Sequence, residues 1–319
     1  MVKLLLLFIT TLSLASDLAG LYRTEGADAL HRVLDRELTQ REYWDALLAE
    51  QDTRFGYFEN TSALLNCDKN SSTLKFFRRD ENGTFRLQNS YGAYTGKANG
   101  DKLKEGDLKT PVGVYRLTEK LNKLDPFYGP MAFVTSYPNF YDRIRGKNGS
   151  GIWIHGLPAD AKREPYTRGC IAIENGDLEC LDRNLNYQQA LLVIDQNLNI
   201  HVDKNALTAI LAELFRWRYA WTYNDLETYL GFYGDDFVRE DGMRIDAFRD
   251  YKTQIFSRNE EKEILFKNIA VIPYPGDDPN LYAVLFDEDY RTRFHTFNGK
   301  KGLIVRLKDG NRIQIVAEQ

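Results

Sequence analysis

Hydrophobic positions along this chain switch between two periods, and the switches predict its elements. Apolar residues three or four apart predict helices over 28–52, 206–223, 225–237 and 248–256. Short alternating or continuous apolar runs predict strands across most of 61–202 and again near the end of the chain. The predicted fold class is α+β, with a strand-rich middle region between a helical start and a helix-then-strand end.

Glycine, proline and asparagine divide the apolar runs into individual strands. Glu81-Asn82-Gly83 predicts a tight hairpin turn, and residues 91–106 and 136–151 are predicted loops. A short helix is expected from Leu178 to Leu185, with a cap at 175–177. The predicted strands are 63–67, 73–77, 84–87, 114–117, 131–135, 190–194, 269–272, 281–286, 302–307 and 312–316.

The N-terminus has the pattern of a secretory signal peptide. Lys3 supplies a basic start, an apolar run follows from Leu4 to Leu14, and Ala15-Ser16 offers a small-residue cleavage site. The run is too short to span a bilayer, although an uncleaved anchor is the alternative. The pattern predicts a periplasmic protein with a signal peptide over residues 1–16.

Three further regions are expected after the signal peptide. Residues 17–60 form a helical arm, 61–202 a strand-rich domain, and 203–319 a domain of helices followed by strands. The spacing from Thr39 to Glu42 predicts a capping box for the second helix of the arm. Two helices cannot bury an apolar stripe alone, so the arm either packs on its own chain or forms a homodimer.

Composition argues against several classes of function. The chain has 42 lysine and arginine residues against 46 aspartate and glutamate residues, giving a net charge of −4. Because the charges are mixed and form no basic stripe, nucleic-acid binding is not expected. Neither C-x-x-C nor H-x-x-x-H spacing occurs, so a zinc site is not expected. No other metal and no cofactor is expected either.

One histidine and one cysteine stand at the ends of neighbouring predicted strands. His155 ends an alternating apolar run, and Cys170 begins another. If these strands pair, imidazole and thiol come within reach, and a nearby imidazole favours the nucleophilic thiolate. The N–H groups around Gly169 and Cys170 are then expected to form an oxyanion hole. Structural roles are the alternative, since cysteine often packs as a small apolar residue.

The other two cysteines leave a choice open. Cys67 and Cys180 are either bridged to one another or buried as thiols, and their apolar surroundings favour buried thiols. Cys170 must be a free thiol if it is catalytic.

Two sequence blocks make the His–Cys signal more specific. Residues 153–156 (W-I-H-G), a loop and residues 167–171 (T-R-G-C-I) resemble the signature of the L,D-transpeptidase (YkuD-type) catalytic domain. Upstream, residues 106–115 are similar to the G-x-x-x-T-P-x-G-x-[FY] element of that family. The resemblance spans 61–202 and implies a mostly antiparallel β domain that acts on peptidoglycan stem peptides.

The resemblance also implies roles for individual residues. Cys170 would be the nucleophile and His155 its base, oriented by the backbone carbonyl of Gly156. Because stem peptides end in carboxylates, nearby cations are candidates for binding that end, with ordinary surface charge as the alternative. The aromatic segment around Tyr128 is a candidate cleft wall. The substrate-binding candidates are Tyr128, Trp153, Lys162, Arg163, Thr167 and Arg168.

The C-terminal region resembles a second family. Its helices carry W-x-x-x-W at Trp217 and Trp221 and Y-L-x-F-Y from Tyr229 to Tyr233, similar to the NTF2-like cone fold. Such a cone implies an accessory pocket and assigns no activity by itself. The domain order, with G-C-I-A-I-E-N and F-Y-G-P-M-A-F-V, resembles the cell-shape-determining L,D-carboxypeptidases of helical ε-proteobacteria.

Three functions follow from these resemblances. Transpeptidases of the family usually carry an arginine two residues after the cysteine, where this chain has Ala172. This difference favours an L,D-carboxypeptidase that trims stem tetrapeptides to tripeptides over a transpeptidase that forms crosslinks. A non-catalytic wall-binding or scaffold protein is the alternative from another class.

Overall fold

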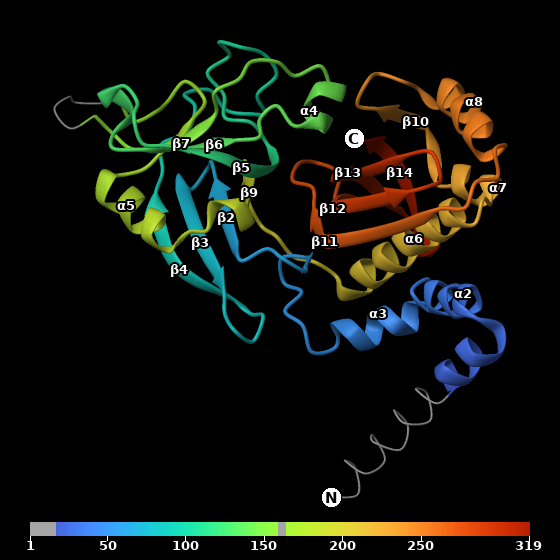
Figure 1. Cartoon of the computed structure of the whole chain (residues 1–319). Coiled ribbons are helices and arrows are strands. Elements are labelled where there is room, and N and C mark those ends of the chain that lie inside the picture. Colours follow the sequence, from blue (N-terminus) through green and yellow to red (C-terminus); the bar gives the residue numbers. More distant parts are fainter. Residues whose placement is uncertain (1–16, 159–163) are drawn as a thin grey trace, which may run out of the picture.

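The computed structural model describes residues 17–158 and 164–319. The predicted signal peptide therefore lies outside the described residues. Two strand-rich lobes lie side by side, with helices of the N-terminal arm beneath one of them (Figure 1). In these described ranges, no helix is both long and apolar enough to span a membrane. The fold is α+β, as the sequence predicts.

The first lobe is built on an eight-stranded sheet. Its strand order is β4-β3-β2-β9-β5-β6-β7-β8, and its pairs are antiparallel except β2–β9 and β7–β8. The last strand in sequence, β9, thus lies in the middle of the sheet. The strands are β2 (Ala63–Asp68), β3 (Thr73–Arg79), β4 (Phe85–Gly92), β5 (Gly113–Leu121), β6 (Ala132–Thr135), β7 (Trp153–His155), β8 (Ile171–Ala172) and β9 (Ala190–Asp195).

Two predictions for this lobe need correction. The predicted loop 136–151 contains helix α4 (Phe140–Ile144), which begins with a capping box between Asn139 and Asp142. Helix α5 (Asn175–Asn184) starts earlier than predicted and has no side-chain cap, because the Asn175 side chain bonds elsewhere. Both errors come from polar residues near helix starts, whose partners the sequence does not reveal.

The second lobe is a cone of helices against a curved sheet of order β1-β11-β12-β13-β14-β10. The predicted helix 225–237 is wrong beyond residue 230. Gly231 follows its last helical residue, and a strand that pairs in parallel with the final strand begins at Tyr233. The elements are α6 (Lys204–Thr222), α7 (Leu226–Leu230), β10 (Tyr233–Arg239), α8 (Ile245–Phe256), β11 (Glu263–Pro273), β12 (Leu281–Arg291), β13 (Thr296–Lys308) and β14 (Arg312–Glu318).

The N-terminal arm belongs structurally to the cone. Helix α3 (Arg41–Leu48) buries Trp44 and Leu48 in the cone core, and the Trp44 ring lies 5.1 Å from that of Phe215 on α6. Strand β1 (Tyr57–Phe58) then joins the edge of the cone sheet. Helix α2 (Ala27–Glu37) buries no residue. The arm therefore packs on its own chain through α3 and leaves Val33 and Leu34 of α2 exposed.

The predicted capping box of α3 is also wrong. Gln40 occupies the cap position without a side-chain hydrogen bond, and Thr39 donates to the carbonyl of Arg36 in the preceding helix. Thr39 precedes the cap residue, and its hydroxyl accepts from the Gln40 side-chain amide at 2.8 Å, whereas α3 has no side-chain cap.

The two lobes share a hydrophobic core. Leu64, Val114 and Val193 of the first sheet pack in one cluster with Ile272 and Ile304 of the cone sheet. Each lobe also has its own core on the far side of its sheet. Both sheets are thus covered on two faces, which explains why β2 and β9 read as continuous apolar runs.

Candidate functional site

His155 ends β7 and is nearly buried, with 1% of its surface exposed. Its Nδ1 lies 2.7 Å from the carbonyl oxygen of Gly156. A carbonyl can only accept a hydrogen bond, so Nδ1 carries the proton and Nε2 is the basic nitrogen. The imidazole is thereby oriented by the group that the family resemblance implies.

The register of two short strands places the thiol relative to this imidazole. β7 and β8 pair in parallel, with Ile154 opposite Ile171 and His155 opposite Ala172. Side chains alternate along a strand, so Cys170 lies on the same side as Ala172 and His155. Ile154 and Ile171, on the opposite side, are fully buried in the core of the lobe. The predicted thiol–imidazole pair therefore shares one face of the sheet edge.

Hydrogen bonds hold both the side chain and the backbone of Cys170. The Cys170 thiol donates to the carbonyl of Gly151, in the loop before β7, at 3.3 Å. The buried Thr167 hydroxyl donates to the Cys170 carbonyl at 2.7 Å and accepts from the Gly169 N–H at 3.0 Å. Thr167 thus stabilises the conformation of the nucleophile loop, although it was predicted to bind substrate. Because the Gly169 N–H already donates to the Thr167 hydroxyl, the Cys170 N–H is the better candidate of the two predicted oxyanion donors.

Gly169 is required by the way two sequence blocks meet. Its φ is +142°, and a Cβ added there would lie 2.9 Å from the carbonyl oxygen of Lys109. Side-chain-bearing residues rarely adopt that φ, and the contact is too close for a Cβ. The 106–115 block therefore packs directly against the nucleophile loop.

A segment predicted as a plain loop also lies along the nucleophile loop. Thr167 donates from its N–H to Thr95, and Lys97 donates to Thr167. Tyr94 and Ala172 exchange two backbone hydrogen bonds, of 2.8 and 2.9 Å. Sequence reasoning missed this contribution because the segment has no alternating apolar pattern.

Asn175 holds the residue after the His155-Gly156 pair. Its Oδ1 accepts from the Leu157 N–H at 2.8 Å, and its Nδ2 donates to the Leu157 carbonyl at 2.9 Å. A Cβ on Gly156 would meet this Oδ1 at 2.2 Å, and one on Gly129 would meet it at 2.5 Å. Both glycines therefore make room for the amide. The available signal was the asparagine in G-C-I-A-I-E-N, which the sequence analysis assigned to capping.

The predicted aromatic wall lies against the imidazole. The Tyr128 ring makes edge contacts with His155, with centroids 5.0 Å apart, and with Trp153 at 5.1 Å. The Tyr128 carbonyl also accepts from the Gly156 N–H. Tyr128 and Trp153 are both half-buried, so each presents part of its ring beside the histidine.

The predicted substrate-binding cations are less defined. Arg168 is exposed in the nucleophile loop. Lys162 and Arg163 lie outside the described residues. Among residues 17–158 and 164–319, no group of three or more His, Cys, Asp or Glu side chains is arranged to hold a metal ion.

Cys67 and Cys180 are not bridged to one another, and Cys180 is only half-buried, so the predicted burial of both thiols is correct for Cys67 alone. Cys67 is completely buried in β2, and burial raises the pKa of its thiol to about 12. A thiol with such a pKa is inert near neutral pH, whereas the register of β7 and β8 places Cys170 on the face of His155.

Comparisons with protein families agree with this geometry. Residues 63–191 match the L,D-transpeptidase catalytic domain, YkuD. Residues 209–319 match the Cds6 C-terminal NTF2-like domain. No curated protein matches the chain at a significant level.

Solved structures extend the similarity across both lobes. The helical cell shape determining protein Pgp2 from Campylobacter jejuni is 38% identical, with a TM-score of 0.81 over 88% of this chain and 99% of that one. A single-site variant of Pgp2 gives a TM-score of 0.83 over 89% and 99%. Bd1075 from Bdellovibrio bacteriovorus, 24% identical, shows the same fold with a TM-score of 0.64 over 84% and 96%.

Identity of 38% over most of both chains, together with the two matched domains, shows common ancestry. This chain belongs to the same family as the helical cell shape determining protein Pgp2, and it joins an L,D-transpeptidase catalytic domain to a Cds6 C-terminal NTF2-like domain.

Proposed function

We propose that this protein is a cysteine L,D-carboxypeptidase that removes the terminal D-alanine from peptidoglycan stem tetrapeptides. The observation that carries the proposal is the shared face of Cys170 and His155, with Nδ1 of the imidazole bound to the Gly156 carbonyl. That arrangement leaves Nε2 as the base for a neighbouring thiol.

The reaction would proceed in two steps. His155 takes the thiol proton, and the Cys170 thiolate attacks the carbonyl carbon of the peptide bond before D-alanine. The oxyanion forms near the Cys170 N–H, and His155 returns the proton to the leaving amine of D-alanine. Water, deprotonated by His155, then adds to the thioester, releases the tripeptide and restores the thiol.

The surroundings of Ala172 support hydrolysis over crosslinking. This residue is fully buried, stands opposite His155 and is bonded through its backbone to Tyr94. An arginine at this position would have to displace its neighbours. A guanidinium at this position, which could bind the stem peptide that accepts the acyl group in crosslinking, therefore has no room. Hydrolysis needs no such group, because its acceptor is water.

Further parts of the proposal concern location and assembly. We infer export to the periplasm, where the stem peptides are, from the sequence pattern at the N-terminus. The apolar side chains of α2, with Val33 44% and Leu34 42% exposed, support a homodimer through the arm.

We also infer that the cone serves as an accessory pocket domain. Its interior holds a charged group of Lys252, Glu288, Lys301 and Glu318 among aromatic rings. Charged side chains are seldom retained in a core without a polar partner or ligand to meet them.

The test uses the chain without residues 1–16 and purified disaccharide-tetrapeptide, with and without a free D-amino acid. Mass spectrometry would follow the products, with Cys170→Ala as the inactive control. Loss of D-alanine that depends on Cys170 is the expected result.

Two other outcomes would change the assignment. Exchange of the terminal D-alanine or formation of crosslinked dimers would make the protein a transpeptidase. Absence of any product that depends on Cys170, combined with binding to isolated cell walls, would favour the scaffold function instead.

A further inference from the structure

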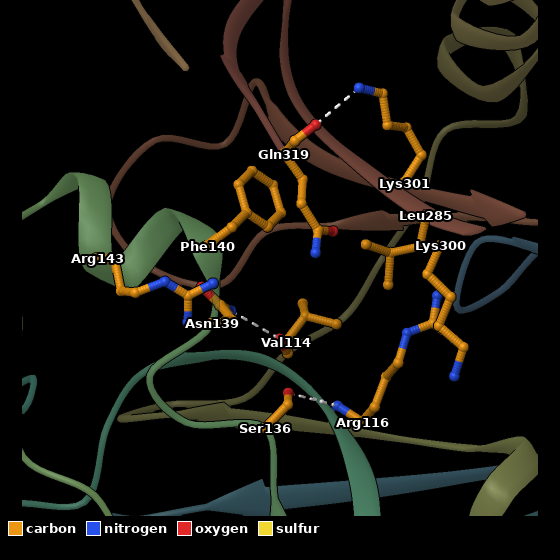
Figure 2. A pocket seen from close by; sticks show the side chains of 10 residues that line it. All are labelled: Val114, Arg116, Ser136, Asn139, Phe140, Arg143, Leu285, Lys300, Lys301 and Gln319. Carbon is orange, nitrogen blue, oxygen red and sulfur yellow. Dashed lines mark hydrogen bonds between the residues drawn. The ribbon is translucent and has the colours of Figure 1, made fainter. Parts of the chain in front are cut away.

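Beside the shared core, a crevice of about 210 Å³ lies between the two lobes on the side of α4. Its walls come from β5 and the start of α4 in the first lobe, and from β12, β13 and the last residue of the cone. In Figure 2, Arg116 extends from β5 toward Leu285 and Lys300 of the cone. The lining residues are Val114, Arg116, Ser136, Asn139, Phe140, Arg143, Leu285, Lys300, Lys301 and Gln319.

The charged side chains that line the crevice are all positive. Four cations and no aspartate or glutamate side chain line it, and the backbone oxygen of the last residue, Gln319, accepts a hydrogen bond from Lys301 at 2.8 Å. Arg143 is paired with Glu240, and Lys301 is paired with Glu318. Within the described residues, neither the Arg116 guanidinium nor the Lys300 ammonium forms an ion pair or a hydrogen bond.

Arg116 is the more informative of these two cations. It is half-buried, and burial lowers the pKa of its guanidinium, with Asp287 as the nearby opposing charge. Asp287 is itself engaged by the Asn268 amide. Removing a cation from water without a direct partner costs free energy, and an anion inside the crevice would offset that cost.

The remaining walls restrict the kind of anion. Val114, Phe140 and Leu285 give the crevice an apolar side, and Ser136 and Asn139 lie on its polar side. The volume is below that of ordinary drug-sized sites, which hold about 300–1,000 Å³. One unpaired arginine matches a carboxylate through two parallel hydrogen bonds, whereas a phosphate dianion calls for more uncompensated charge.

We propose that the crevice between the lobes is a binding site for the carboxylate end of a small ligand with a short apolar stem. Arg116 binds the carboxylate, Lys300 adds the second positive charge from the cone, and Val114, Phe140 and Leu285 contact the stem. The ligand thereby touches both lobes at once. This site is separate from Cys170, and the proposal does not depend on the reaction there.

The experiment uses the full chain without residues 1–16, carrying Cys170→Ala so that nothing is turned over. Acetyl-D-alanine is titrated while backbone amide shifts are followed by NMR, and inorganic phosphate is titrated in parallel. We expect saturable shifts at Val114, Ser136, Phe140 and Leu285 with acetyl-D-alanine. Arg116→Gln should weaken that binding about tenfold or more, and Lys300→Gln should weaken it less.

Arg78→Gln is the matched control, because Arg78 is an exposed arginine of β3 outside the crevice. Shifts confined to the neighbourhood of Cys170, or crevice shifts unchanged by Arg116→Gln, would overturn the proposal. Phosphate binding as tight as that of acetyl-D-alanine would overturn the assignment to a carboxylate. Circular dichroism of Arg116→Gln would show that the variant is folded.

Discussion

A neutral backbone carbonyl orients His155 in this site, so the residues that hold that carbonyl in place also position the imidazole. The carbonyl of Gly156 fixes the imidazole tautomer but adds no charge, so its exact position depends on the hydrogen bonds around it. Gly156 donates to Tyr128, and the next residue, Leu157, is held by both polar atoms of the Asn175 amide. Asn175 is therefore a positioning residue for the proposed base.

We expect Asn175→Ala to lower kcat on disaccharide-tetrapeptide by about 10- to 100-fold, because small displacements of catalytic groups have effects of this size. Alkylation of Cys170 should also slow near neutral pH, since the thiolate would lose its aligned imidazole. Asn184→Ala, at the other end of α5, is the control, because its amide bonds only the Cys180 carbonyl. Equal rates for both variants would remove Asn175 from the positioning role.

The buried carboxyl of Glu288 gives a prediction about pH. Burial raises its pKa from 4.5 to about 7, and its Oε2 has no hydrogen-bond partner within the described part of the chain. The folded state therefore keeps a proton that the unfolded chain releases above pH 4.5. The stability from this group is complete below pH 4.5 and is lost as the pH rises through 7.

The unfolding free energy of the wild type should fall between pH 4.5 and 7 as Glu288 ionises. In Glu288→Gln we expect this fall to be smaller by roughly 1–3 kcal/mol. Urea unfolding of both proteins at several pH values measures the difference. Lys252, whose pKa burial lowers to about 8, titrates above this window. Glu263→Gln, on the exposed end of β11, should follow the wild type. A variant with the wild-type pH profile would show that Glu288 is charged in the fold.

Among the elements, α2 differs from its neighbours in having no buried residue. Asp35 of α2 pairs with Arg218 and accepts from Tyr223, so polar contacts tie the helix to α6. Its apolar Val33 and Leu34 remain outside these contacts. The exposed Val33 and Leu34 of this amphipathic helix are therefore available to a second copy.

If α2 forms the proposed homodimer, adding charge to its apolar side should separate the subunits. We expect the double variant Val33→Asp, Leu34→Asp to be monomeric in light scattering at concentrations where the wild type is dimeric. His31→Asp adds a charge at an exposed polar position of the same helix and should leave the dimer intact. A wild type that is monomeric throughout would reject the dimer.

Much of this element structure follows from the sequence, and the exceptions share a cause. Short, nearly continuous apolar runs such as 63–67 and 190–194 correctly predicted buried strands. The pairing of Tyr94 with Ala172 and the Asn175 bonds to Leu157 were not predictable, because each depends on a partner far away in sequence. Tyr233 to Phe237 was misassigned because its aromatic spacing also suits a helix, until pairing with β14 decides it.

At the scale of the whole molecule, the lobes are joined by ionic as well as apolar contacts. Lys147 and Asp142 form an ion pair of 2.9 Å with almost no exposure. Arg145 lies 3.2 Å from the same carboxylate and 3.3 Å from the hydroxyl of Tyr274 in the cone. Because this cluster and the shared core connect both sheets, the lobes should unfold together.

Asp142→Asn should destabilise the protein by about 1–3 kcal/mol, since the buried Lys147 ammonium loses one of its two carboxylate partners and keeps Asp101 at 2.6 Å. Calorimetry should show one transition for the wild type, at a temperature well above that of the variant. Asp182→Asn, which breaks a partly exposed pair with Lys120, should change the stability by less than about 1 kcal/mol. Two resolved transitions in the wild type would show that the lobes are independent.

The central place of β9 matters for how the chain is made. A ribosome delivers β2 to β8 first, but β9, at residues 190–195, lies between the β4-β3-β2 half and the β5-β6-β7-β8 half of their sheet. Likewise β1 is synthesised early, but its pairing partner β11 lies at 263–273, so β1 stays unpaired until that part of the chain is made. Neither sheet can close during early synthesis, and a chain cut near residue 202 would expose the apolar face that the cone covers. The first sheet can therefore be complete only after residue 195 has emerged, and the cone sheet only after β14 at 312–318, so the newborn chain stays partly open through most of its synthesis, a state compatible with the proposed export.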